Sequence, residues 1–401
     1  MPRTKNNSSR SANGSGSIRK VTRTKNGTTY TYWEARITVG YDPGTGKQMQ
    51  RSITGKTQKE VREKLSKIST ELDESTYIPP TRETVGSWLD TWLETYIVPN
   101  DKPSTMYSYR GVCKNHIKPA LGMVRLEQLT TIQIQQFYNT LTRDKSLSAK
   151  TVKNIHAVLH KALKRAVQSG LIRRNPSDDC ELPKVCQKEF TPLEFDDVAR
   201  FLQAIQGHPL ENLYYVDLFT GLRQGEILGL TWDCVDFKKN TLYINKQLQK
   251  IRESGGTYCL VTTKSSKSRL LTVAPSVMEA LKRQKKKQAQ DQLLAGPAWE
   301  NKNNLVFTNQ TGGHLAHGTV YNNYKRIVAS IGLGHVRFHD LRHTYAVMAL
   351  ESGDDLKTIQ TNLGHATAVF TLNVYGHVSQ RMRQQSADRM ERLIRAASGE
   401  G

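Results

Sequence analysis

The sequence predicts a multidomain protein that is mainly α-helical with small β elements. Its 401 residues exceed what one compact domain usually holds. A strand-like alternation of apolar and polar residues follows residue 25, and apolar residues at helical spacing dominate residues 82–176. We therefore expect a β-rich N-terminal unit of three strands and one helix (26–76), a helical domain (82–176) and a mixed α+β domain with a C-terminal tail (188–401).

The charge of the chain points to a polyanionic partner. Its net charge is +22, and such an excess attracts nucleic acid or, as the alternative, an anionic membrane surface. There is no apolar run of about 20 residues and no secretory signal, so we expect a cytoplasmic protein. Its five cysteines are scattered and odd in number, which predicts reduced packing residues rather than disulfides or a zinc cluster.

The N-terminal region combines a basic segment with a small β unit. Residues 1–25 hold seven Lys or Arg and no acid, so we expect a flexible basic arm or a solubilising tail. Tyr30–Tyr41 alternates, with Arg36 on the polar face, and Gln48–Thr54 is the expected return strand. Thr57 begins a helix with Glu60 as its capping-box partner. Such a unit can lay its sheet in a DNA groove or dock a protein.

Helical patterns follow a Pro79–Pro80 linker. Four helices are expected, and the last, 149–169, ends at Gly170. One face of that helix is apolar and the other is basic, which indicates either a DNA-contacting surface or a solvated face. The basic residues are Lys150, Lys153, Lys161, Lys164 and Arg165.

The last domain is expected to follow a second linker at residues 177–190. Thr191-Pro192-Leu193-Glu194 predicts the cap and first turn of a helix. Strand patterns then occur at Thr241–Asn245, Tyr258–Thr262 and Leu270–Val273, and helices continue to the end of the chain.

Three distant segments of this domain predict one phosphate-handling site. Arg223 lies beside glycine turns at a helix start, where Glu226 one turn later can brace it. His339 and Arg342 share a helix face, although His339 and His343 also have the i, i+4 spacing of metal ligands. The third segment is Leu363-Gly364-His365, followed ten residues later by Tyr375.

The order and spacing of these segments resemble the tyrosine-recombinase (phage integrase) family over residues 188–385. The helical unit resembles the core-binding domain of that family, and the β unit resembles the arm-binding domain of integrases of temperate phages and conjugative transposons. The family also has a lysine in a hairpin between the two arginines. Lys264, within the segment 258–271, matches it best, and Lys267 is the alternative.

The resemblance implies a mechanism of DNA strand breakage and rejoining. Tyr375 attacks the scissile phosphate to form a 3′-phosphotyrosyl bond, while Arg223 and Arg342 clamp the non-bridging oxygens. Lys264 protonates the leaving 5′-oxygen, His339 deprotonates or orients Tyr375, His365 hydrogen-bonds the phosphate, and Glu226 supports Arg223. No metal or nucleotide cofactor is expected. Expected partners are double-stranded DNA, three further subunits in a homotetramer, an excisionase and DNA-bending accessory proteins.

We therefore expect an integrase of a bacterial mobile element. Alternatives of the same chemistry are a chromosome- or plasmid-resolving recombinase, against which the extra β unit weighs, and a type IB topoisomerase. A non-catalytic DNA-binding protein of the same fold is a different class. Replacing Tyr375 by Phe separates it from an enzyme, because only an enzyme loses a covalent DNA adduct.

Overall fold

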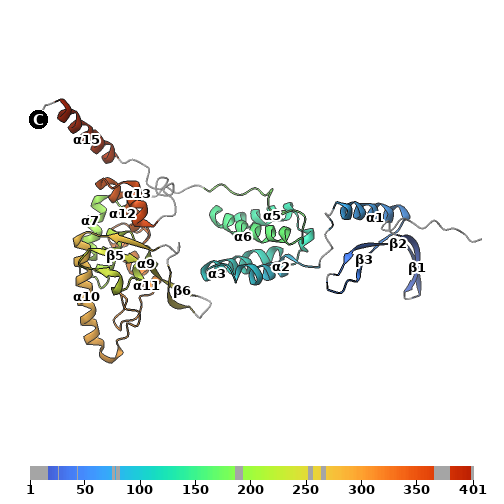
Figure 1. Ribbon diagram of the computed structural model, residues 1–401, viewed down its shortest axis with the longest axis horizontal. Coiled ribbons are helices and arrows are strands. Elements are labelled where there is room, and N and C mark those ends of the chain that lie inside the picture. The colour runs from blue at the N-terminus through green and yellow to red at the C-terminus, as the bar shows by residue number, and fades with distance from the viewer. Residues whose placement is uncertain are drawn as a thin grey trace, which may run out of the picture. The chain divides into compact units, whose positions relative to one another are not determined.

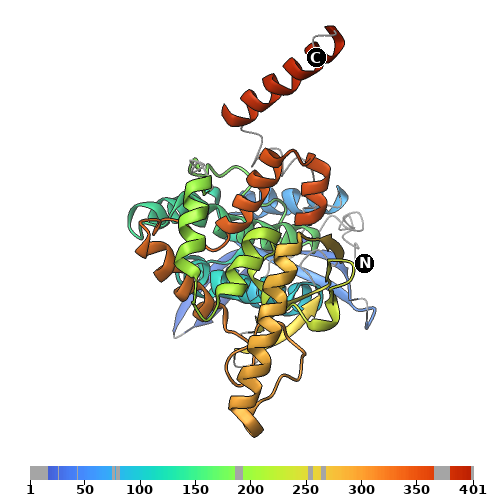
Figure 2. The ribbon, with the colours of Figure 1, turned by 90° about the vertical axis from the view of Figure 1, so that its left-hand side faces the viewer.

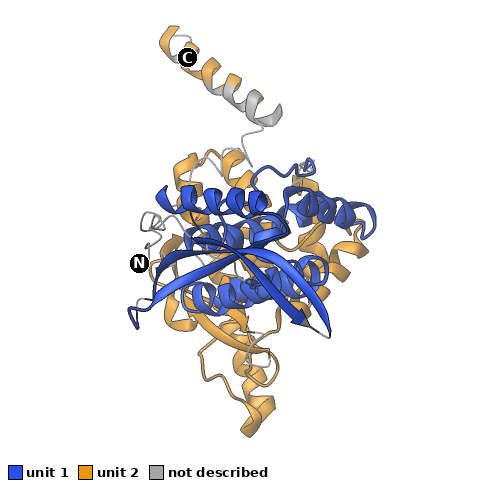
Figure 3. Cartoon of the chain, turned by 90° about the vertical axis from the view of Figure 1, so that its right-hand side faces the viewer, with its two compact units in different colours: residues 1–186 blue, residues 187–401 orange. Residues whose placement is uncertain are grey.

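The computed structural model describes residues 17–25, 27–42, 44–74, 77, 82–185, 193–251, 256–262, 268–364 and 380–398. The chain forms two compact units, Met1–Cys186 and Gln187–Gly401 (Figures 1 and 3). The fold is mainly helical with small sheets, as predicted. Within the described ranges, every helix is too short or too polar to cross a membrane.

The first unit begins with a three-stranded antiparallel sheet of order β1-β2-β3. The strands are β1 (Ser17–Lys25), β2 (Thr28–Tyr41) and β3 (Gln48–Gly55), and helix α1 (Gln58–Asp73) packs on one face. The predicted alternation is confirmed, because Ala35 and Ile37 are buried against Val61 and Leu65 of α1. The Thr57 hydroxyl caps α1 by accepting from the Glu60 N–H, and the Glu60 carboxylate accepts from the Lys56 N–H at 3.0 Å.

The sheet starts earlier than expected. Strand β1 lies inside the predicted arm of residues 1–25, so that prediction is wrong for Ser17–Lys25. Every residue of β1 pairs with a residue of β2, and backbone pairing does not require apolar side chains. Ile18 adds an apolar contact to the core. The rest of the predicted arm, residues 1–16, lies outside the described residues.

The second part of this unit is all helical. Trp88 and Trp92 lie in its core, and the Trp88 indole donates to the Ala162 carbonyl oxygen at 2.9 Å. Gly170, with φ of +70°, follows the last helix as predicted. The elements are α2 (Val85–Trp92), the π-helical turn η1 (Leu93–Ile97), α3 (Pro103–Val112), the π-helical turn η2 (Cys113–Ile117), α4 (Lys118–Leu121), the 3-10 turn η3 (Leu126–Gln128), α5 (Thr131–Arg143) and α6 (Ala149–Gln168).

The helical core extends past the predicted boundary at residue 176. Ser177 is fully buried, and Cys180 and Leu182 pack against the core. Glu181 N–H donates to the Gln135 side chain of α5 at 2.8 Å. The predicted linker 177–190 is therefore wrong for residues 177–185, because Cys180 and Leu182 of this segment pack against the helical core.

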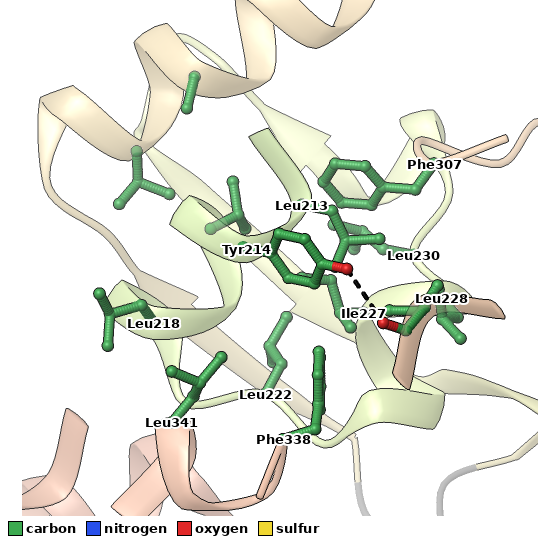
Figure 4. Close-up of a cluster of buried hydrophobic side chains, with 14 of the residues drawn as sticks. Leu213, Tyr214, Leu218, Leu222, Ile227, Leu228, Leu230, Phe307, Phe338 and Leu341 are labelled. Carbon is green, nitrogen blue, oxygen red and sulfur yellow. Dashed lines mark hydrogen bonds between the residues drawn. The ribbon is translucent and has the colours of Figure 1, made fainter. Parts of the chain in front are cut away.

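The second unit has helices around small sheets. Its helices are α7 (Phe195–Ile205), α8 (Glu211–Thr220), α9 (Gln224–Leu228), α10 (Pro275–Ala295), α11 (His317–Ser330), α12 (Asp340–Ser352), α13 (Leu356–Leu363) and α15 (Gln380–Ser398), with 3-10 turns η4 (Trp232–Cys234) and η6 (Gly296–Ala298). Helix α10 packs beside α8 and continues past the core (Figure 2). Tyr214 of α8 lies at the centre of the core and donates to the Val320 carbonyl oxygen at 3.0 Å (Figure 4).

The strands of this unit pair differently from the predicted hairpin. Strands β4 (Val235–Asp236), β5 (Thr241–Ile244) and β8 (Arg269–Thr272) form one sheet, and β6 (Lys246–Ile251) with β7 (Thr257–Thr262) forms another. Strand β7 therefore pairs with β6, and β8 pairs with β5, so the expected pairing of the two strands that flank Lys264 is wrong. Strand β6 begins two residues after β5 ends, and it was not predicted because its sequence, KQLQKI, is mostly polar.

The ends of this unit also differ in detail from expectation. Helix α7 begins at Phe195 with Glu194 as N-cap, three residues after the predicted start; Thr191 and Pro192 lie outside the described residues. A helix in the C-terminal tail was expected, and α15 is present. Its apolar residues Met390, Leu393 and Ile394 are exposed.

Gly221 predicts a measurable packing constraint. It ends α8 with φ of +60°, and a Cβ there would lie 2.6 Å from Tyr345 Cδ1 and 2.8 Å from Leu363 Cδ2. We expect Gly221→Ala to lower the free energy of unfolding by about 2–4 kcal/mol, from left-handed strain plus overpacking. The control is Gly207→Ala, where φ is +72° but a Cβ meets no atom within 4 Å. It should cost only about 1 kcal/mol in urea denaturation. Equal losses would show that the neighbours do not require glycine at residue 221.

Candidate active site

The first predicted arginine lies at the junction of two helices. Helix α8 ends at Gly221, and Arg223 is the N-cap of α9. Its Nη1 donates to Glu226 Oε1 at 2.7 Å, and its backbone N–H donates to Glu226 Oε2 at 3.1 Å. The predicted brace between Arg223 and Glu226 is therefore present. About a quarter of the Arg223 side chain, 27%, remains exposed.

Glu226 is held by a second arginine. Its side chain is 0% exposed, and Arg269 of β8 donates to both of its oxygens, at 3.2 Å from Nη1 and 2.7 Å from Nη2. Burial alone would raise the pKa of this carboxyl, but the hydrogen bonds and charge of Arg269, and then of Arg223, outweigh burial and lower the pKa to about 2. Glu226 is therefore ionised and joins α9 to β8.

The second predicted arginine is almost wholly buried. Arg342 of α12 is 2% exposed. Its Nη1 donates to the Gly221 carbonyl oxygen at 2.7 Å and its Nη2 to the Leu363 carbonyl oxygen at 2.6 Å. These two bonds fix the plane of the guanidinium group between the end of α8 and the end of α13.

Three arginines from three segments meet at the last turn of α13. Arg269 Nε donates to the Asn362 carbonyl oxygen at 2.7 Å, Arg342 to that of Leu363, and Arg223 Nη2 to that of Gly364 at 3.2 Å. These carbonyls lie at the negative end of the helix dipole, where cations are stabilised. With one ionised carboxylate among three guanidinium groups, the cluster carries net positive charge and is suited to bind an oxyanion such as phosphate.

The predicted histidine stands beside this cluster. His339 is exposed, immediately precedes α12, and its ring centroid lies 5.0 Å from that of His343. Crowding by surrounding protein, and then the charge of Arg342, lower the pKa of His339. Burial and the neighbouring His339 lower the pKa of His343 to about 4. Both rings are therefore neutral at pH 7, and a neutral His339 can accept a proton.

The metal interpretation of the histidine pair gains no support. Over the described residues, no group of three or more His, Cys, Asp or Glu side chains has a geometry that could hold a metal ion. The positive charge of Arg342 beside His339 disfavours a cation there.

Four predicted residues cannot be located. Lys264, its alternative Lys267, His365 and Tyr375 lie outside the described residues. The described range before His365 and Tyr375 ends at Gly364, whose carbonyl oxygen accepts from Arg223. The described residues on either side of the two lysines are Thr262 and Ser268.

Comparison with known families identifies the two parts of the chain. Residues 192–382 match the Phage integrase family, and residues 84–142 match the phage integrase N-terminal SAM-like domain. The chain belongs to the phage integrase family. Members of this family are tyrosine recombinases, which cleave and rejoin DNA, so the predicted family and enzyme class are confirmed.

Relatives of this phage integrase match most of its length. A tyrosine recombinase XerC-like protein of Caldanaerobacter subterraneus subsp. tengcongensis is 29% identical, over 94% of this chain and 99% of that protein. The ICEBs1 integrase of Bacillus subtilis is 24% identical, over 90% of this chain and 97% of its own length. A solved structure of the Tn1549 transposon integrase with a circular intermediate DNA matches with a TM-score of 0.65 at 22% identity, over 77% of this chain and 99% of that one. The last likeness confirms the fold class.

The basic residues predicted to bind DNA belong to the first unit of this phage integrase. Five lie on α6, where Lys150 and Lys164 are exposed and Lys153 is half-buried. Lys161 donates to Asp101 Oδ2 at 3.2 Å, and its Nζ lies 5.1 Å from the Tyr109 ring centroid.

Arg165 and Arg36, the other two of the six predicted residues, also lie close to neighbouring side chains. The Arg165 guanidinium carbon lies 4.4 Å from the Tyr96 ring centroid. Arg36 on β2 is exposed and lies 3.7 Å from Glu34. The apolar face of α6 is buried as predicted, so the basic residues occupy its outer side.

The sequence did not identify Arg269 or Asp217 as site residues. Signals for both exist. Strand alternation puts Arg269 on the same side as Leu271, so an inward-facing Leu271 would place the charged side chain of Arg269 against the core, where it requires a partner. Asp217 interrupts a helix that is apolar on several sides, with Leu213, Tyr214 and Leu218 all buried, so an acid within it is buried too.

Asp217 is an unusual acid beside the arginines. It is 0% exposed, and both of its carboxyl oxygens have no hydrogen-bond partner among the described residues. Burial raises its pKa well above the ordinary value, and the charge of Arg342 only partly opposes this. Its backbone carbonyl accepts from Gly221 N–H at 2.9 Å, so the carboxyl group sits one turn from a carbonyl that Arg342 binds.

Asp217 predicts a pH-dependent stability. A raised folded-state pKa means that the stability from protonated Asp217 is complete below the unfolded pKa and is lost as pH rises through the folded value. Asn does not titrate, so Asp217→Asn should gain stability over the parent protein as pH rises from 5 to 7. The gain is at most about 1.4 kcal/mol per pH unit, the value for one proton.

The measurement is urea denaturation of both proteins at several pH values. Asp388→Asn, an exposed position on α15, is the control for loss of a surface acid. A difference between Asp217→Asn and the parent protein that stays constant with pH would show that Asp217 is ionised throughout.

Proposed function

We propose that this chain is the integrase of a mobile element, a site-specific recombinase that exchanges DNA strands through a 3′-phosphotyrosine. The observation that carries the proposal is the convergence of Arg223 and Arg342, from segments more than a hundred residues apart, on adjacent carbonyls of one helix turn. Relatives named as integrases support it, as do the Tn1549 integrase with a circular intermediate DNA and a lambda integrase tetramer bound to a Holliday junction.

The arginines act as the clamp on the scissile phosphate. Phosphodiester cleavage builds charge on the non-bridging oxygens, and guanidinium groups already fixed by other bonds stabilise that charge without reorganising. Arg223 is fixed by Glu226 and Gly364, and Arg342 by Gly221 and Leu363. Glu226 is a supporting residue, since its oxygens accept from the side chains of Arg223 and Arg269 and from the Arg223 N–H.

The remaining roles go to His339 and to two residues outside the described ranges, His365 and Tyr375. Tyr375 is the nucleophile, His339 takes or orients its proton, and His365 hydrogen-bonds the phosphate. The attack breaks the bond from phosphorus to the 5′-oxygen and forms one to the phenol oxygen. A 5′-hydroxyl of a partner strand reverses the step on new DNA. His365 directly follows Gly364, which Arg223 binds, and this supports its place at the site.

Tyr375→Phe tests the nucleophile. We expect no covalent adduct on a nicked suicide substrate, a loss of at least about 1,000-fold, because Phe has no phenol oxygen. Affinity for the same DNA in a gel-shift assay should stay within about 3-fold, since binding depends on phosphate contacts elsewhere. Tyr345→Phe is the control, a half-buried tyrosine that accepts from Asn362. A DNA-linked peptide that contained another tyrosine would overturn the assignment.

Lys264 is proposed as the acid that protonates the leaving 5′-oxygen. Lys264 matches the family pattern better than Lys267, and Arg269, which follows both lysines, is bonded to Glu226 in the arginine cluster. A sulfur in place of the 5′-bridging oxygen leaves without a proton, so such a substrate should restore cleavage by Lys264→Ala to within about 10-fold of the parent rate. Lys267→Ala should cleave ordinary DNA at near the parent rate. Sulfur rescue of Lys267→Ala instead would exchange the two roles.

The first unit is proposed to bind the DNA. Its sheet exposes basic residues including Arg36, which suits a sheet laid against arm-site DNA, and the outer face of α6 suits core-site phosphates. The assembly proposed is a homotetramer on two DNA duplexes, with an excisionase and DNA-bending proteins setting direction. The exposed apolar residues of α15 support a tail that packs on a neighbouring subunit.

A further inference from the structure

We propose that Arg269 is a positioning residue of the recombination reaction, which sets the geometry of Arg223 and of the turn that leads to His365. The inference rests on the proposed function and adds a residue to it. Arg269 is not a catalytic residue in this proposal, because its side chain is only 8% exposed and its guanidinium nitrogens are bonded to other protein groups.

All three guanidinium nitrogens of Arg269 have partners. Nη1 and Nη2 form a two-point contact with the Glu226 carboxylate, and Nε donates to the Asn362 carbonyl oxygen. A planar fork with donors on two edges matches this arrangement, and lysine cannot reproduce it. Arg269 therefore joins β8, α9 and the end of α13 through one rigid group.

The first consequence concerns Arg223. Glu226 has no access to solvent, so it depends on its arginines for charge compensation. Without Arg269, the carboxylate has Arg223 as its remaining described cationic partner and draws that guanidinium into a two-point contact. Arg223 would then turn from the Gly364 carbonyl, and from the phosphate that it is proposed to clamp.

The second consequence concerns the chain on either side of the site. A Cβ on Gly364 would lie 3.1 Å from Arg269 Nη1 and 3.2 Å from its Cδ, so the arginine side chain fills the space beside that residue. Gly364 has φ of +64° and is followed by His365. Arg269 also pairs in register with Ile244 at the start of β8, just after the segment that holds Lys264. One side chain thus fixes the borders of both segments proposed to reach the phosphate.

The test compares Arg269→Gln, Arg269→Lys and the control Arg283→Gln, an exposed arginine on α10. Single-turnover adduct formation on a nicked suicide substrate and affinity for the same DNA are measured for each. We expect Arg269→Gln to form adduct about 100-fold more slowly, because a displacement of about 1 Å at a reacting group has that effect. Its DNA affinity, and both properties of Arg283→Gln, should stay within about 3-fold of the parent. Arg269→Lys should be intermediate.

A double variant separates positioning from simple loss of folding. Glu226→Gln combined with Arg269→Gln removes the uncompensated buried charge, so it should fold even if Arg269→Gln does not. If the two changes acted independently, their separate reductions of the adduct rate would multiply. The double variant should form adduct well above that multiplied rate, since both changes affect one network. Adduct formation by either Arg269→Gln variant within about 3-fold of the parent rate would overturn the inference. Failure of the parent protein to form any adduct would instead overturn the proposed function.

Discussion

The carboxylate of Glu226 lies between two guanidinium groups with no access to water, and the geometry of the arginine cluster depends on it. An isolated carboxylate in such a place would be strongly destabilising, so the ion pairs of Arg269 and Arg223 with Glu226 stabilise the fold as well as placing the guanidinium groups. Their binding to Glu226 aligns both guanidinium planes with the last turn of α13. The helix accepts them because its final carbonyls have no partners within the helix. Sequence positions 223, 269, 342 and 362–364 are therefore brought together by one buried anion and one helix end.

Much of the fold could be predicted, because it follows from local periodicity. The alternation through Ala35 and Ile37 gave β2, and the apolar stripe of Val152, Ile155 and Leu159 gave α6. Predictions failed where pairing with distant residues decides the outcome. Strand β1 has few apolar residues and is ordered by its partner β2, and β7 pairs with β6 rather than with β8. The sequence of a single strand does not indicate which other strand it pairs with.

The site could be predicted in part for a related reason. Arg223 and Glu226 are three residues apart on one helix, so their contact follows from helix geometry. Arg269 meets Glu226 across 43 residues, and only the folded sheet brings it there. The alternation of β8 shows that either Leu270 or Leu271 faces the core, but not which, and the side of Arg269 depends on that choice. Asp217 was accessible from the sequence as an acid within an apolar helix, but its place beside Arg342 was not.

The charge of the cluster depends on which of its two buried carboxyl groups is ionised. Glu226 has arginine donors on both oxygens, and its pKa falls to about 2, so it always contributes a negative charge near neutral pH. Asp217 has the same chemistry but no hydrogen-bond partner among the described residues, and burial raises its pKa. A raised pKa favours the protonated form of Asp217, which places no second negative charge beside Arg342. Three arginines opposed by one carboxylate leave an excess of positive charge, which suits the proposed binding of a phosphodiester, whose non-bridging oxygens share one negative charge. The net charge of the cluster therefore depends on the two acids as well as on the arginines. Glu226 has hydrogen-bond donors on both oxygens, whereas Asp217 has none among the described residues.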